Sequence, residues 1–507
     1  MGVAASRRHG ENAFLDHHAP IHGGVEIKAA SSAAALAWAV SAGLACFAWN
    51  LFISRYLVAD SFMDLDAGRL IARSGIPHHE ALTSAAHGQP WIDQQWLAHL
   101  LYYGTWSLAG YAGLAIASSL LIGTAFGLLA GLMAYLGAPP QRAAAWTLFA
   151  FVACLGNTIV RAQSFSYPLF VALLWLLVVD SRRTSFRRTF LLAFPLLAVW
   201  SNLHGAVVLG IGLTVAYASV RTAIAISRRD RQSAAGYGAT AVLTPLTLFA
   251  NPYGFSVVGY YDKLLARPAL AAHVSEWARP TITSPLSWGF FALLGVSLAT
   301  VGYAAWRRYR PPWIVLLLAA GLALAASQGV RYQAWFALAG ALMVAVTLAG
   351  LRPLPPPLSP LVLQAGAGLT VIFAVFAVLV IGRTSTAQFE TLTARGAVDA
   401  AAVFAEDHPR ARILADDLSS ALLLWKFPRL HERVAFDIRL EQYSDRQLQR
   451  WFAFQNGKGA GWEASTAAYD VLIATQSRTP TLANRLRATS GWRTLFEDAS
   501  GVAVARG

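Results

Sequence analysis

The sequence has few charges and almost no cysteine. Only 13% of its 507 residues are Asp, Glu, Lys or Arg, against roughly 25% in ordinary soluble domains, whereas 56% are hydrophobic. The two cysteines, Cys46 and Cys154, both lie within apolar runs, which excludes a disulfide framework or a cysteine-based metal cluster. So little charge excludes a secreted enzyme, a cytosolic globular protein and a disordered chain. The composition predicts a membrane protein.

Uncharged or nearly uncharged runs recur along most of the chain. The polar first 32 residues precede a run that is too long and too deep in the chain for a cleaved signal peptide, so we expect an uncleaved anchor. As one helix, residues 189–220 would extend about 48 Å, more than a hydrocarbon core of about 30 Å, which predicts a tight hairpin at residues 202–205. About eleven transmembrane helices are therefore expected, over 33–57, 110–136, 144–160, 165–179, 189–203, 205–220, 236–250, 286–306, 312–328, 332–350 and 359–382.

Arginine is concentrated in short segments between these runs. The formal charge is +14, with 40 Lys and Arg against 26 Asp and Glu. With the N-terminus inside, the clusters at 182–188, 221–231 and 307–310 fall on one side of the membrane, which the positive-inside rule makes cytoplasmic. We interpret them as topology signals and expect no nucleic-acid partner.

The composition changes near residue 383. We expect a cytoplasmic tail at 1–32, a transmembrane domain at 33–383 with a long first non-cytoplasmic loop at 59–109, and a soluble α/β domain at 384–507 on the non-cytoplasmic side. In the last part, the pattern predicts helices over 387–406, 419–426, 444–455, 462–468 and 480–489, strands over 412–417, 433–437 and 470–474, and a hairpin over 492–505. Asp416, Asp417 and Asp437 lie at the C-terminal ends of two of these strands, where they are either ligand contacts or helix caps and partners of Arg439.

Three carboxylates lie close together in the first loop. Asp60 and Asp64 are four residues apart and share one face of a helix, whereas Asp66 points elsewhere. A carboxylate near an apolar boundary can have a raised pKa and act as a general base. The structural alternative is that Asp60 caps a helix and Asp64 pairs with Arg69 or a neighbour. The three residues are also a weak signature for a divalent cation.

Other polar residues collect at span ends on the same side. Arg161 and Arg331 are candidate phosphate partners, because a guanidinium fork matches phosphate oxygens. His204 is a candidate for a phosphate or sugar hydroxyl, and Trp91 for stacking on a sugar. Singly, such residues are commonly turn formers and interfacial anchors. The remaining substrate-binding candidates on this side are Gln163, Asn202, Asp93 and Glu276.

These pieces form an ordered set along most of the chain. They are Asp60, Gly68-Arg69, Gly75-Ile-Pro77, Pro90-Trp91-Ile-Asp93, Trp96-Leu97, Arg161-Ala-Gln163, Asn202-Leu-His204-Gly205, Asn251-Pro-Tyr-Gly254, Glu276-Trp277, Asp416-Asp417 and Phe436-Asp437-Ile-Arg439. The set resembles the GT-C superfamily of polytopic glycosyltransferases, and more narrowly a little-characterised bacterial group within it. Members of that group often have Trp-Trp-His where this chain has Phe62-Met63-Asp64.

The resemblance implies an α-helical polytopic membrane protein of the bacterial inner membrane, GT-C-like, with a small C-terminal α/β domain in the periplasm. It implies a hexosyl or pentosyl transferase that moves a sugar from a polyprenyl-phosphate donor to a lipid-linked glycan, polysaccharide or protein acceptor. Asp60 would be the base, with Asp64 second, and a divalent cation stays open as cofactor. Two alternatives remain: a lipid-linked sugar flippase or polysaccharide-assembly transporter, and a non-catalytic assembly scaffold of the same fold.

Overall fold

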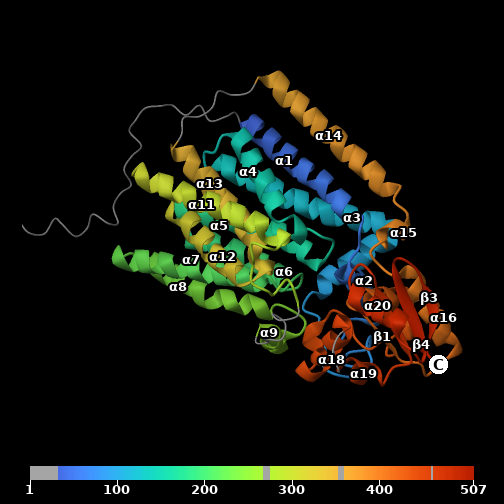
Figure 1. The fold of residues 1–507 in the computed structure, drawn as a ribbon. Coiled ribbons are helices and arrows are strands. Elements are labelled where there is room, and N and C mark those ends of the chain that lie inside the picture. Colours follow the sequence, from blue (N-terminus) through green and yellow to red (C-terminus); the bar gives the residue numbers. More distant parts are fainter. Residues whose placement is uncertain (1–31, 266–273, 352–358, 458–460) are drawn as a thin grey trace, which may run out of the picture.

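The computed structural model describes residues 32–265, 274–351, 359–457 and 461–507. Long helices form a bundle, and a small sheet with short helices lies at one end of it (Figure 1). The expected cytoplasmic tail lies almost wholly outside the described residues.

Each expected apolar run falls on a helix of the bundle. Seven described helices are long and apolar enough to cross a membrane, or eight if the bent pair Arg231–Phe249 and Gly254–Leu264 is one span. This confirms a polytopic membrane protein, but α4, α6 and α12 have only 14 to 16 residues, or about 21 to 24 Å. The bundle comprises α1 (Ser32–Ile53), α3 (Trp96–Tyr135), α4 (Pro140–Ala153), α5 (Ser166–Arg182), α6 (Phe186–Trp200), α7 (Val207–Ser227), α8 (Arg231–Leu243), α9 (Val257–Leu265), α11 (Trp288–Trp306), α12 (Trp313–Gln328), α13 (Gln333–Leu351) and α14 (Pro360–Gly382).

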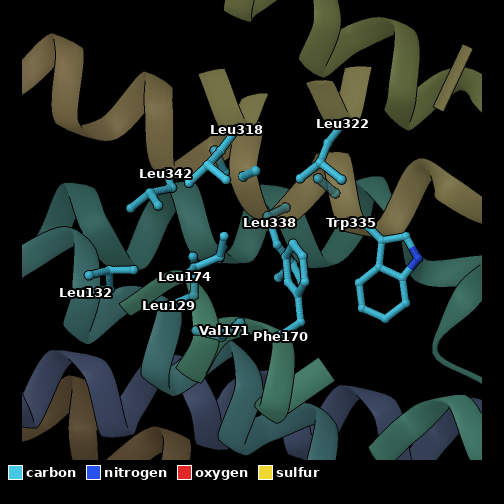
Figure 2. Close-up of a cluster of buried hydrophobic side chains, with 14 of the residues drawn as sticks. Leu129, Leu132, Phe170, Val171, Leu174, Leu318, Leu322, Trp335, Leu338 and Leu342 are labelled. Atoms are coloured by element: carbon cyan, nitrogen blue, oxygen red, sulfur yellow. The ribbon is translucent and has the colours of Figure 1, made fainter. Parts of the chain in front are cut away.

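The centre of the bundle is a packed apolar core around α13, which is buried from Gln333 to Thr347. α14 lies at the edge beside α1 and has few buried residues, as expected of a helix that faces lipid. Figure 2 shows side chains of α3, α5, α12 and α13 meeting in this core, among them Leu129, Leu132, Phe170, Val171, Leu174, Leu318, Leu322, Trp335, Leu338 and Leu342.

The first loop is mostly helical. It contains α2 (Ala59–Ser74), which packs against α3 and against α17 (Asp417–Lys426) of the C-terminal part, and 11 of its 16 residues are buried. α3 is interrupted at Ala109 and Gly110, where Gly110 has φ 61°, a conformation that favours glycine. Residues 96–108 are therefore a separate helical segment, as the expected start of the second span at residue 110 requires.

The C-terminal part contains a four-stranded sheet with the order β1-β2-β4-β3. β1 (Ile413–Ala415) is parallel to β2 (Val471–Thr475), whereas β4 (Gly501–Arg506) is antiparallel to both β2 and β3 (Trp492–Glu497). The helices are α15 (Thr386–Phe389), α16 (Arg395–Asp407), α17 (Asp417–Lys426), α18 (Asp445–Asn456), α19 (Gly461–Thr466) and α20 (Pro480–Ala488). They follow the expected alternation, which confirms a small C-terminal α/β unit.

The strand expected at 433–437 is wrong. Val434 forms only an isolated bridge with Ile413, and the chain there is held between β1 and the first loop. The Ser84 amide donates to the carbonyl of Val434, and the Ala85 amide donates to that of Ala435. Residues 84 and 85 of the first loop thus supply hydrogen bonds to residues 434 and 435 that a neighbouring strand would otherwise supply.

A buried ion cluster joins the first loop to the C-terminal part. Arg439 donates to both oxygens of Glu80, at 2.5 and 2.8 Å, and through Nε to Asp437 at 2.8 Å. Its guanidinium lies 4.2 Å from the centre of the Trp91 ring. The proposed domain boundary at 383 stays a prediction, because these contacts cross it.

Candidate active site

A cavity of about 1420 Å³ lies where the helix bundle meets the C-terminal part. Its wall combines the start of α2, the turn at 159–163, the hairpin after α6 and the segment 274–277 with residues of α17 and α18. Segments far apart in the sequence therefore share one chamber. Its charged lining residues are Asp60, Asp64, Arg161, Glu276, Arg331, Asp417, Glu441 and Arg478.

Asp60 lies in the first turn of α2, where it lines the cavity. The N-cap of this helix is Val58, so Asp60 is not the capping residue of the structural alternative. Burial raises the pKa of Asp60 to about 6; the Arg161 guanidinium opposes this rise, and Glu276 and Asp64 add to it. A carboxylate with this pKa is mostly ionised at neutral pH yet holds a proton more readily than an exposed one. This is the property that a general base requires.

Asp64 lies one turn further along α2 and also lines the cavity. Its Oδ1 is 3.2 Å from Nε2 of His99, whose Nδ1 is 2.9 Å from Oδ2 of Asp93. Asp93 therefore holds His99 from behind and does not line the cavity. Gly68 permits this arrangement, because a Cβ at that position would lie 2.1 Å from the carbonyl oxygen of His99.

Asp66 faces the opposite side of α2. It pairs with Arg69, and its Oδ2 is 3.1 Å from Nε2 of His431. The structural alternative in which Asp64 pairs with Arg69 is therefore wrong, and Asp64 contacts His99 of α3. Across the residues that the structure describes, no group of three or more His, Cys, Asp or Glu is arranged to hold a metal ion. Asp60 and Asp64 line the cavity whereas Asp66 faces Arg69 and His431, so the three carboxylates do not fit a shared cation.

Arg161 is a buried cation at the cavity wall. Its Nη1 donates to Oε1 of Glu276 at 2.6 Å, while its Nε and Nη2 have no hydrogen-bond partner among the described residues. The Arg161 guanidinium holds the pKa of Glu276 below its usual range. Arg331 stacks on Trp277 with its guanidinium 3.9 Å from the ring centre, and its amide donates to the carbonyl of Glu276. Residues 276–277 thus hold two arginines beside one chamber.

The other expected substrate residues divide into two groups. Gln163 and His204 line the cavity, whereas Asn202, Trp91 and Asp93 do not. Burial holds the pKa of His204 well below its usual range, so it is neutral and its Nδ1 accepts from the Ala206 amide.

Asn202 is a turn former. Its side chain accepts from Trp96 Nε1 at 2.8 Å and donates to the Ala250 carbonyl at 2.6 Å. Trp91 lies beneath Arg439 and is 2% exposed, so it cannot stack on a sugar in this arrangement. The expected substrate contacts of Asn202 and Trp91 are therefore wrong: the two residues support the site and do not line it.

Three functional candidates, Glu441, Arg478 and His99, were not expected from the sequence, and a fourth, Asp417, was expected as either a ligand contact or a helix cap. Glu441, Asp417 and Arg478 line the cavity from the C-terminal part, and burial raises the pKa of Glu441 to about 7. Arg478 donates to Asp417 at 3.0 Å. His99 lies in an apolar stretch at the start of α3. Only Asp417 carried a signal, as a residue that follows a strand.

One wall of the cavity is apolar and comes from two membrane helices. Gly212 on α7 and Gly321 on α12 both have open space where a Cβ would lie. The wall consists of Val208, Leu209, Gly212, Leu213, Gly321, Leu322 and Ala325. The chamber therefore joins a charged end to an apolar slot.

No family model and no curated protein matches the sequence. Solved structures do match in fold. The oligosaccharyltransferase AglB from Archaeoglobus fulgidus, in complex with an inhibitory peptide and a dolichol-phosphate, is 11% identical with a TM-score of 0.54, over 93% of this chain and 74% of that one. The arabinofuranosyltransferase AftD from Mycobacteria is 16% identical with a TM-score of 0.50, over 94% of this chain and 40% of that one. The chain therefore has the GT-C fold, as expected from the sequence.

Proposed function

We propose that the protein is an integral membrane glycosyltransferase. It moves a sugar from a polyprenyl-phosphate donor to a lipid-linked glycan, polysaccharide or protein acceptor at the periplasmic face of a bacterial inner membrane. The observation that carries this proposal is the cavity in which Asp60 and Asp64 share a wall with the partly unpaired Arg161. A base and a phosphate partner in one chamber are the two elements that this transfer requires.

The reaction follows from the placement of these groups. The acceptor hydroxyl or amide attacks the anomeric carbon of the sugar, and Asp60 takes the proton that the acceptor loses. The bond between that carbon and the phosphate oxygen breaks, and the polyprenyl phosphate leaves with the electron pair. Arg161 and Arg331 stabilise the negative charge on the leaving phosphate.

The apolar wall supports a lipid donor in particular. A phosphate held at Arg161 would have the slot between α7 and α12 beside it, with Gly212 and Gly321 leaving room for a prenyl chain. The AglB structure, which has the same fold, contains a dolichol-phosphate. The arginine clusters at 182–188 and 221–231 lie at the other end of α5 and α7, which supports placing the cavity on the non-cytoplasmic side.

The test is a deletion strain in which lipid-linked sugars and envelope glycans are compared with the parent by mass spectrometry. We expect one glycan to lack a sugar and its lipid-linked donor to accumulate. Wild-type protein should restore the glycan, whereas Asp60→Asn should restore it at a rate lower by on the order of a hundredfold or more. Asp60→Asn should still bind undecaprenyl phosphate, measured on purified protein in nanodiscs by native mass spectrometry.

The same experiment separates the alternatives. A scaffold tolerates Asp60→Asn, so full restoration by that variant would exclude the base and favour a scaffold. A flippase needs polar groups along a path through the bundle. At the arginine-rich end, the buried carboxylate of Asp180 is instead held by the hydroxyls of Tyr217 and Tyr237, at 2.6 and 2.7 Å. Both oxygens of Asp180 thus have hydrogen-bond partners, so this carboxylate offers no unpaired group to such a path.

A further inference from the structure

α2 carries two contacts between a histidine and a buried aspartate, on opposite sides of the helix. Asp64 contacts His99 at 3.2 Å, and Asp66 contacts His431 at 3.1 Å. The chemistry is the same, but only Asp64 lines the cavity. The two contacts therefore provide a natural pair for separating a role in the site from a role in packing.

His99 differs from His431 in having a carboxylate at each ring nitrogen. Nε2 faces Asp64 and Nδ1 faces Asp93, and the His99 residue is only 3% exposed. A neutral imidazole has one nitrogen without a proton, which would place a lone pair against a carboxylate oxygen. The two carboxylates at its ring nitrogens favour an imidazolium at His99, although only Nδ1 is hydrogen-bonded, to Asp93. The trio carries one net negative charge at the cavity wall.

Packing alone does not call for this trio. Buried ion pairs pay a large desolvation cost, and well-packed apolar residues of the same volume are often as stable. The trio is nevertheless held tightly, because Gly68 lets α2 approach the carbonyl of His99 closely. The trio carries a desolvation cost and reaches the cavity only through Asp64. We therefore look for its role at the Asp64 carboxylate.

We propose that Asp93 and His99 are positioning residues that hold the Asp64 carboxylate ionised and fixed at the cavity wall, one helical turn from Asp60. This inference rests on the proposed function. The negative charge of Asp64 makes Asp60 hold a proton more strongly, and so makes it a better base for the acceptor. Without His99, Asp64 would lose its fixed orientation and would take up a proton more readily, since burial disfavours its charge. Sugar transfer would slow, whereas donor binding at Arg161 would not change.

The experiment compares His99→Gln with its matched control His431→Gln in the deletion strain and on purified protein. Gln keeps a polar side chain but cannot carry the positive charge. We expect His99→Gln to restore the glycan at a rate lower by roughly tenfold or more, with undecaprenyl phosphate binding within about twofold of wild type. His431→Gln should restore the glycan at nearly the wild-type rate. Both rates are divided by the amount of folded protein, measured by size-exclusion chromatography.

A second variant keeps the inference testable if His99→Gln does not fold. Asp93→Asn leaves the imidazole in place and removes only its rear carboxylate, so it should lower the rate in the same direction. The double variant Asp93→Asn, His99→Gln should be no slower than His99→Gln alone, because the two residues act as a unit. Equal rates for the His99 and His431 variants would overturn the proposal, as would a parallel loss of donor binding.

Failure of this inference is distinguishable from failure of the proposed function. If Asp60→Asn stops transfer while His99→Gln and Asp93→Asn do not, only the positioning role fails. If Asp60→Asn restores the glycan fully, the glycosyltransferase mechanism itself fails, whatever the His99 variants do.

Discussion

Two buried arginines, Arg161 and Arg439, show how alike the groups of a candidate site and of a structural junction can be. They are 6% and 7% exposed, and each is paired with a glutamate from a distant segment. Arg439 uses its Nε and both terminal nitrogens on Glu80 and Asp437. Arg161 uses one nitrogen on Glu276, and its other two have no hydrogen-bond partner within the described part of the chain.

The two arginines differ in how many of their nitrogens are hydrogen-bonded, not in burial or charge. A buried group whose nitrogens are all hydrogen-bonded is a structural link, because any change leaves its partners unpaired. A buried group with unused donors beside a cavity is suited to bind an anion that supplies the missing acceptors. By this measure Arg439 joins two parts of the fold, whereas Arg161 fits the phosphate-binding role that we propose for it.

The largest expected effect is on stability, at Arg439. Arg439→Met keeps much of the side-chain volume but leaves Glu80 and Asp437 buried without their cation. We expect the free energy of unfolding to fall by about 3–5 kcal/mol, as for other buried pairs that lose one partner. Thermal unfolding of the protein in detergent, followed by tryptophan fluorescence, measures this. A variant as stable as wild type would contradict a structural role for the cluster.

A smaller effect, on binding, is expected at Arg161. Arg161→Ala should weaken undecaprenyl phosphate binding by about 10- to 100-fold, since hydrogen bonds to charged groups contribute about 1.5–3 kcal/mol. Arg161→Lys should restore part of the affinity, because a point charge replaces a planar fork. Titration in nanodiscs gives the dissociation constants. If Arg161→Ala binds like wild type but loses as much stability as Arg439→Met, the distinction between the two arginines fails.

The smallest expected effect is a shift in pH dependence. Because the pKa of Asp60 is about 6, its basic form is lost as pH falls, and the transfer rate in membranes should drop about tenfold from pH 7 to pH 5. Glu276→Gln removes a negative charge that raises this pKa, so the acid limb should move to lower pH by less than one unit. An acid limb that moves to higher pH, or stays in place, would contradict an effect of the Glu276 charge on the pKa of Asp60.

The sequence predicts the fold well because its signals are local. Apolar runs and arginine clusters are read along the chain, and the bundle follows them. Asp60 and Asp64 could also be predicted from the sequence, since a spacing of four places both on one face of a helix. Position at span ends on one side of the membrane also predicted four residues of the cavity wall, Arg161, His204, Glu276 and Arg331.

The rest depended on contacts between distant segments. His99 lies in an apolar stretch, and only the approach of α2 to α3 makes it a partner of Asp64. Glu441 and Arg478 reach the cavity because the C-terminal part folds over it. Trp91 and Asn202 were assigned to substrate because a polar or aromatic residue that braces a loop has the same local pattern as one that binds a ligand.

Gly68 has a consequence for relatives of this protein. Any side chain there would meet the backbone of His99, so α2 and α3 can approach each other this closely only with glycine at this position. Homologues in which α2 and α3 approach as closely should therefore have glycine at 68, whatever residue stands at 64. An alignment would thus separate the packing requirement at position 68 from the side-chain chemistry at positions 64 and 99.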